Sequence, residues 1–128
     1  MSPLPLVLIS ALFGGMGAAM RVLMILACTE RRGLPMRWTI LIVNLTGSVC
    51  AGACTAGFSR VDPNGIARAA VIGGILGGFT TFSSFAIECI EQWQRGHRSR
   101  CAIYAIGSML ACGAAAWIGF EAARGIHA

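Results

Sequence analysis

The chain has 128 residues, of which 56% are hydrophobic and 12% charged, with a mean hydropathy of +0.73 and a formal net charge of +5. A soluble domain typically carries about 25% charged residues, so this composition predicts a membrane protein with short loops and excludes a separate soluble domain. The ten basic residues are all arginines and form no dense run. Nucleic-acid binding needs a clustered basic face, so we expect no nucleic-acid partner.

Four apolar segments follow one another along the chain, each near the roughly 20 residues that a transmembrane helix needs. We expect a single four-helix domain over residues 1–128, with spans at about 4–28, 39–58, 69–93 and 101–120. The first segment lacks a basic start and is too long for a cleaved signal peptide, so we interpret it as a retained span. The predicted fold class is an all-α membrane protein.

The connections and the cysteines carry less information. Asp62-Pro63-Asn64-Gly65, between the second and third segments, is a strong turn signal. Most of the six cysteines fall inside apolar segments, where cysteine behaves as a small hydrophobic residue. Cys50 and Cys54 share a helix face, but the two histidines, His97 and His127, lie in a loop and at the C-terminus, so we predict no zinc site.

The third segment differs from an inert membrane anchor. Residues 73–88 hold four glycines, four hydroxyl side chains and three phenylalanines. Glycine and hydroxyl residues at membrane depth are tolerated where freed backbone groups find partners in protein or beside a water-filled path. The segment therefore predicts a transmembrane helix broken near Gly77 to Thr80, and broken helices at the membrane midplane are a recurrent way to build an ion site.

Small residues recur at helical spacing in all four segments. The pairs four residues apart are Gly14/Ala18, Gly47/Ala51, Gly73/Gly77, Gly74/Gly78 and Gly107/Ala111. Such pairs let transmembrane helices approach closely, so we expect tight packing within one subunit or between two.

The arginines give a weak indication of orientation. Six lie on the side of the first and third connections and three on the opposite side: Arg31, Arg32, Arg37, Arg95, Arg98 and Arg100 against Arg60, Arg68 and Arg124. This bias mildly favours both termini outside the cytoplasm, and it also permits insertion in both orientations.

Three motifs together resemble one protein family. Asn44 within Val43-Asn44-Leu45-Thr46-Gly47, and the run Gly77-Gly78-Phe79-Thr80-Thr81-Phe82-Ser83-Ser84-Phe85, closely resemble the signature motifs of the CrcB/Fluc fluoride channels. The glycine-rich run from Gly14 to Arg21 resembles that family's first-helix motif. The four-span layout, the length and the order of motifs match over essentially the whole chain.

The resemblance implies a function and an assembly. It implies a fluoride-selective ion channel, not an enzyme, in the bacterial inner (plasma) membrane, giving passive export of fluoride from the cytoplasm and so fluoride resistance. The expected partners are the fluoride ion, the lipid bilayer and a second copy of the chain in an antiparallel, dual-topology homodimer with two pores. A structural sodium ion (Na+) at the dimer interface, held by the backbone carbonyls of Gly77 and Thr80, is also implied; a simple glycine hinge is the alternative for these residues.

The residues expected along the fluoride pore make physical sense. Phe82 and Phe85 are three apart on one helix face, and the positive edges of their rings suit a small anion. Core packing is the alternative for this pair. Asn44 offers two amide N–H donors to an anion, and interhelical hydrogen bonding is the competing explanation.

A polar track is expected beside these residues. Thr81, Ser84 and Glu88 are spaced by three and four on the third helix. Glu88 alternatively marks the interfacial end of the span. Arg21, late in the first span, either attracts anions into a vestibule or extends to the headgroups.

The fourth segment presents one polar face. Tyr104, Ser108 and Cys112 repeat every four residues, and family members place a tyrosine and hydroxyl side chains on such a face. Cys112 stands where Ser or Thr is expected, and a thiol is the weaker donor.

Two other classes of protein were weighed. A small multidrug transporter is also short and four-spanning, but it needs a carboxylate in the first helix. The five acids, Glu30, Asp62, Glu88, Glu91 and Glu121, all lie outside the first span. A structural subunit of a larger membrane complex explains the small-residue packing but not the clustered Thr, Ser and Phe.

Overall fold

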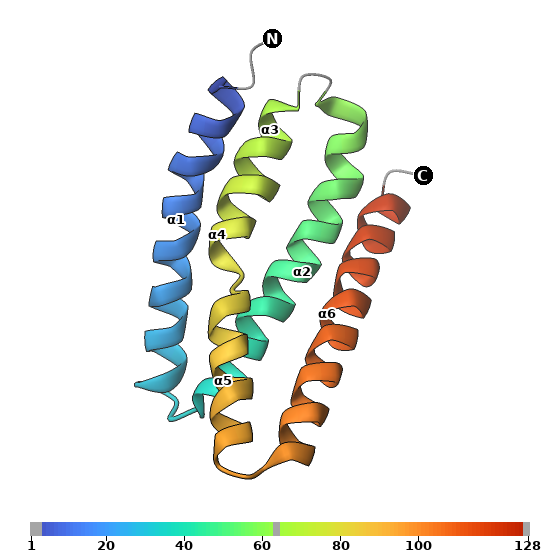
Figure 1. Ribbon diagram of the computed structural model, residues 1–128. Coiled ribbons are helices and arrows are strands. Elements are labelled where there is room, and N and C mark those ends of the chain that lie inside the picture. Colours follow the sequence, from blue (N-terminus) through green and yellow to red (C-terminus); the bar gives the residue numbers. More distant parts are fainter. Residues whose placement is uncertain (1–3, 63–64, 127–128) are drawn as a thin grey trace.

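The computed structural model describes residues 4–62 and 65–126, and in that part of the chain every regular element is a helix. Pro63 and Asn64 of the predicted turn, and His127, lie outside the described residues. The helices run side by side along one axis and alternate in direction (Figure 1). Residues 4, 62, 65 and 126 lie toward one end of the molecule, and the connections at residues 30–35 and 95–97 lie at the other (Figure 1).

Three long helices and one composite helix make up the fold. The long ones are α1 (Leu4–Thr29), α2 (Met36–Val61) and α6 (Arg98–Ile126). The composite one consists of α3 (Ile66–Arg68), the π-helix η1 (Ala69–Leu76), α4 (Gly77–Phe79) and α5 (Phe82–Gln94). Four stretches are long and apolar enough to cross a membrane: Leu4–Thr29, Met36–Phe58, Ile66–Gln94 and Arg98–Gly125. The prediction of an all-α protein with four candidate spans, the third of them interrupted, is confirmed.

The interruption lies at the C-terminal edge of the predicted interval. Gly77 is still helical, whereas Thr80 (φ −73°, ψ 155°) and Thr81 (φ −143°, ψ 114°) are extended. The eight residues of η1 before the break form a wide helical turn, and π-helical segments occur mostly as short insertions, frequently at functional sites. The third span therefore departs from regular α-helix twice, in the π-helix η1 and at the extended residues Thr80 and Thr81.

Glycines allow the close contacts on which this bundle depends. A Cβ on Gly17 would collide with the carbonyl of Ile75, and one on Gly78 with the carbonyl of Gly14, so α1 lies directly against the third span. Gly52 and Gly119 play the same part between α2 and α6, each facing a backbone carbonyl of the other helix. Without a hydrophobic driving force between helices in lipid, such close packing supplies much of the association energy.

The α5–α6 connection ends α5 with a Schellman motif. His97 N–H donates to the carbonyl of Gln92 at 2.9 Å, and Gly96 N–H donates to that of Trp93 at 3.0 Å. Gly96 adopts the left-handed φ of +81° that this motif requires. This tight turn sets the start of α6 beside the end of α5.

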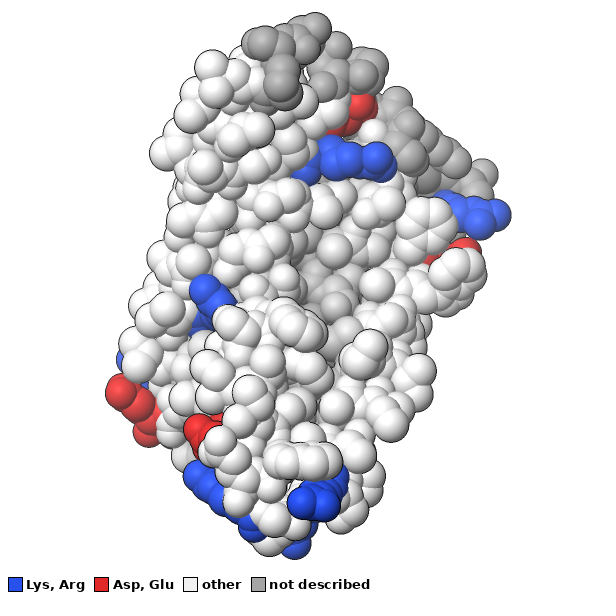
Figure 2. All heavy atoms as spheres, viewed as in Figure 1, with Lys and Arg blue, Asp and Glu red and all other residues white. Residues whose placement is uncertain are grey.

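The outer faces of the helices are apolar. Leu12 is 74% exposed, Ile103 73% and Trp117 66%. A water-soluble monomer rarely exposes so much contiguous apolar surface, whereas a bilayer covers it. On the face seen in Figure 2, most charged side chains lie toward the two ends of the molecule, and one basic side chain lies at mid-height on the left. The chain is a multi-pass membrane protein.

Candidate ion pathway

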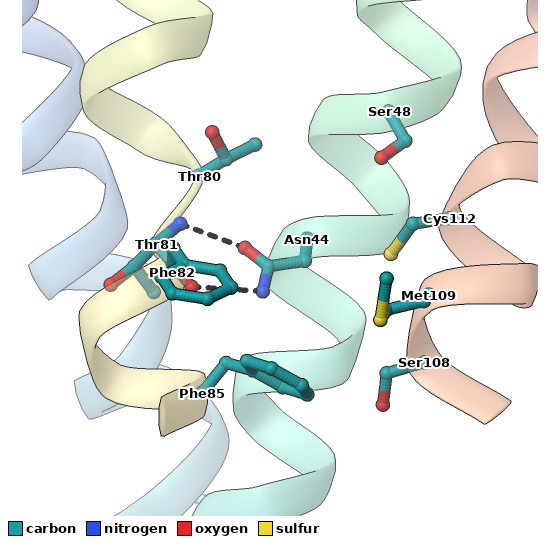
Figure 3. A pocket seen from close by; sticks show the side chains of 9 residues that line it. All are labelled: Asn44, Ser48, Thr80, Thr81, Phe82, Phe85, Ser108, Met109 and Cys112. Carbon is teal, nitrogen blue, oxygen red and sulfur yellow. Dashed lines mark hydrogen bonds between the residues drawn. The ribbon is translucent and has the colours of Figure 1, made fainter. Parts of the chain in front are cut away.

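A cavity of about 270 Å³ lies between α2, α5 and α6 at the level of the helix break. Figure 3 shows the side chains around it, which come from all three helices and from the break itself. The lining residues are Asn44, Ser48, Thr80, Thr81, Phe82, Phe85, Ser108, Met109 and Cys112.

Asn44 holds the break from the side of α2. Its Oδ1 accepts a hydrogen bond from Thr81 N–H at 2.8 Å, and its Nδ2 donates to the carbonyl of Thr81 at 3.1 Å (Figure 3). The amide thus satisfies both backbone groups of one extended residue, as a neighbouring strand would. One amide N–H of Asn44 is spent on this interhelical contact, so a single one is left for any ion.

Thr81 also starts α5. Its Oγ1 accepts from Ser84 N–H at 3.2 Å, the N-cap bond that Thr commonly makes, and donates to Ser84 Oγ at 3.0 Å. This bond and the Asn44 contact divert two backbone donors from their helical acceptors. In an uninterrupted helix Thr81 N–H would bond to the carbonyl of Gly77, and Ser84 N–H to that of Thr80.

The carbonyls of Gly77 and Thr80, which were predicted to bind sodium, have lost their usual helical donors to other acceptors. Gly77 O lies at the start of α4 and Thr80 O in the break. The sequence alone could not show this, because the diversion of the first donor depends on Asn44 from another helix.

The two phenylalanines form one aromatic wall of the cavity. The ring centroids of Phe82 and Phe85 are 5.6 Å apart at an interplanar angle of 44°. Phe82 is 78% exposed, although it lies beside the cavity, so the described residues leave its outer side uncovered. The ring of Phe85 lies between Phe82 and Tyr104, with its centroid 5.5 Å from that of Tyr104.

The opposite wall comes from α6. Ser108 is buried, and its hydroxyl has no hydrogen-bond partner among the described residues. Buried polar groups are nearly always hydrogen-bonded, so an unpartnered hydroxyl in a cavity wall needs an explanation. Cys112 lies one turn further along the same face, where it places a sulfur at the cavity.

The remaining predicted pore residues lie elsewhere. Tyr104 does not line this cavity, and its hydroxyl donates to the carbonyl of Arg37 at 3.1 Å. Ser84 is bonded to Thr81, and Glu88 lies one turn further along α5, where it interacts electrostatically with Arg37. Arg21 is on α1, which contributes no residue to the cavity lining.

Two lining residues were missed from the sequence, Ser48 and Met109. Ser48 follows Asn44 by four residues and so shares its helix face, which was a usable signal. No sequence signal pointed to Met109, because a methionine in an apolar span has no polar pattern to distinguish it.

Comparison with known proteins identifies relatives over nearly the whole chain. The family described as "CrcB-like protein, Camphor Resistance (CrcB)" matches residues 8–120. A protein of Opitutus terrae named "Fluoride-specific ion channel FluC" is 33% identical over 120 residues, covering 91% of each chain. Proteins of the same name from Chelativorans sp. (33% identical, 88% of this chain and 91% of the relative) and Sphingopyxis alaskensis (37%, 79% and 84%) are similar to it as well.

Proposed function

The chain belongs to the CrcB family, and on that premise we propose that it is a fluoride-selective ion channel through which fluoride leaves the cytoplasm passively. Its apolar helices make it a multi-pass membrane protein, in bacteria one of the inner membrane. It catalyses no reaction. A proton-coupled multidrug transporter is disfavoured because the first span, Leu4–Thr29, contains no acidic residue.

The observation that carries the proposal is the cavity wall around Ser108. An unpartnered buried hydroxyl faces a cavity whose other wall is formed by Phe82 and Phe85. A hydroxyl donor and positive ring edges are the groups that favour a small, hard anion stripped of water. A fluoride ion passing here would satisfy the hydroxyl that the described residues leave without a partner.

Fluoride efflux from liposomes tests this directly. Purified protein in vesicles loaded with potassium fluoride should release fluoride on addition of a potassium ionophore, as read by a fluoride electrode. Ser108→Ala should reduce the initial rate at least tenfold, while Ser99→Ala, at an exposed position near the start of α6, should leave it within twofold. Absence of efflux from the unaltered protein would remove the channel proposal, and normal efflux from Ser108→Ala would remove Ser108 from the path.

The working form that we propose is an antiparallel, dual-topology homodimer. Phe82 is 78% exposed beside the cavity, and a second copy covering it would close the open side of the path. The six-to-three division of arginines between the two ends enforces neither orientation strongly. Polar groups that two copies bring face to face at the midplane would lie on a shared two-fold axis.

A sodium ion is the expected occupant of that axis. The carbonyls of Gly77 and Thr80 have lost their usual helical donors to other acceptors, and carbonyl oxygens suit hard cations. The residues present therefore fit a sodium site. When bound, the ion would neutralise carbonyl dipoles at the break and join the two copies; the chain's own part is to keep those carbonyls free.

A further inference from the structure

We propose that a second cavity, which shares a lining residue with the first, is the mouth of the fluoride path, and that Arg37 and Arg100 gather the anion there. This inference rests on the proposed channel function. The second cavity has a volume of about 380 Å³ and is lined by residues of α2, α5 and α6, as the first is. Arg37 and Arg100 both line it.

The two cavities are neighbours with one lining residue in common. Ser108, with its unpartnered hydroxyl, lines both of them. The ring of Phe85 in the first cavity stacks at 5.5 Å on the ring of Tyr104 in the second. An anion that enters the second cavity thus reaches the first by passing Ser108 and the aromatic pair.

The second cavity lies where several positive groups converge. Arg37 is the second residue of α2 and Arg100 the third residue of α6, and these two helix starts lie at the same end of the molecule (Figure 1). The N-terminus of a helix carries a partial positive charge, which adds to that of the guanidinium groups. Nε2 of Gln92, also in the lining, has no hydrogen-bond partner in the described part of the chain.

Tyr104 joins α6 to the start of α2, and Trp38 lies beside Arg37 on α2 itself. The hydroxyl of Tyr104 donates to the carbonyl of Arg37 at 3.1 Å, and the guanidinium of Arg37 lies 5.8 Å from the ring centroid of Trp38. We infer that Tyr104 acts on the path by positioning Arg37, since its proton is committed to a backbone carbonyl.

Carboxylates near the second cavity do not cancel these charges. Glu91 is paired with Arg95 at 3.1 Å, so the charges of these two residues offset each other. Glu88 interacts electrostatically with Arg37, and Arg100 forms no ion pair with any described residue. Neither Glu88 nor Glu91 lines the second cavity, whereas Arg37 and Arg100 both do. A cleft lined by one sign of charge raises the local concentration of counter-ions by roughly 10- to 1,000-fold.

The test compares charge removal at the mouth with a matched removal outside it. Arg37→Gln/Arg100→Gln removes the two charges at the second cavity, and Arg95→Gln with Arg98→Gln removes two charges at the same end. Arg95 is already paired, and Arg98 lies over the ring of Trp93 at 4.9 Å. Initial fluoride flux into liposomes of neutral lipid is measured at low and saturating fluoride, each at low and high ionic strength, with size-exclusion profiles to confirm assembly.

The mouth variant should lose flux about tenfold at low fluoride and low ionic strength, and stay within twofold at saturating fluoride or high ionic strength, since salt screens such attraction. The control variant should stay within twofold throughout. Equal losses in both variants, or a loss that persists at saturating fluoride, would overturn the inference. So would a loss seen only when anionic lipid is added, because the arginines would then serve lipid headgroups. Failure of the unaltered protein to carry fluoride would instead reject the channel function itself.

Discussion

Two replacements of Asn44 separate its possible structural role, bonding to Thr81, from its possible role beside the ion. Ala removes the bonds to Thr81, whereas Asp adds a negative charge. Asn44→Ala removes both hydrogen bonds to Thr81, at 2.8 and 3.1 Å. The N–H and C=O of Thr81, which is only 4% exposed, then lose these partners. Asn44→Asp keeps the acceptor for Thr81 N–H. It replaces the donor by a carboxylate oxygen facing a carbonyl, and places negative charge in the cavity wall.

The size of the stability effect follows from the environment of Thr81. Leaving a buried polar group unsatisfied costs about 1–3 kcal/mol, so two such groups cost about 2–6 kcal/mol in a dry site. Interhelical hydrogen bonds in membrane proteins average only about 0.6 kcal/mol each, because the altered state finds other partners. Thr81 borders a cavity large enough to admit water, so the low end applies. We expect Asn44→Ala to lower the free energy of unfolding by about 2 kcal/mol.

Reversible unfolding in mixed detergent micelles measures this quantity, with Thr46→Ala as the control. Thr46 is on the same helix, but its hydroxyl is exposed and bonds only to the carbonyl of Ile42 within α2. A free energy of unfolding within about 0.5 kcal/mol of the control would refute the structural role of the amide. Fluoride flux then tests the ionic role: Asn44→Asp should abolish flux at matched protein amounts. Normal flux in that variant would place Asn44 away from the ion.

Further changes test the other parts of the site and the assembly. Phe82→Ala and Phe85→Ala should each reduce fluoride flux at least tenfold while leaving the elution volume of the assembly unchanged; normal flux in both would reassign the rings to packing. Gly78→Val should disrupt α1 packing against the third span, because even a Cβ collides with the carbonyl of Gly14, whereas Gly57→Val, in open space, should be tolerated. Exchange of sodium for a large organic cation should lower the melting temperature and the flux, as loss of a ligand specific to the assembled state does; identical values would remove the sodium site. In a background without native cysteines, new cysteines at position 59 and position 96 should each label partially from outside intact cells, and complete labelling of one with none of the other would reject dual topology.

The sequence predicts the spans well because hydrophobic length is a local property, and the break because glycine and threonine cluster in one of them. It does not predict where within the cluster the helix ends. Gly77 and Gly78 are the weakest helix formers there, yet both are helical and the chain becomes extended at Thr80 and Thr81. The choice is made by Asn44, a residue on another helix, which supplies partners to Thr81 alone.

Tyr104 is a second residue whose contact with another helix could not be predicted from the sequence. Its spacing from Ser108 and Cys112 correctly predicts a shared helix face, since Ser108 and Cys112 line the first cavity and Tyr104 lines the second with Ser108. Spacing cannot show that the hydroxyl of Tyr104 is committed to the carbonyl of Arg37. A hydrogen bond between residues 67 positions apart leaves no local pattern in the sequence.

The hydrogen bonds at Thr81 link features that the sequence presents separately. The N–H of Thr81 goes to Asn44 and so leaves Gly77 O without its helical donor, and its Oγ1 takes Ser84 N–H and so does the same for Thr80 O. The same residue lines the cavity beside Phe82. Any change that returns Thr81 to a helical conformation would therefore restore both carbonyls to helical bonds and reshape the cavity at once. The proposed cation site and the proposed fluoride path depend on one extended residue, and Asn44 is the side chain that keeps it extended.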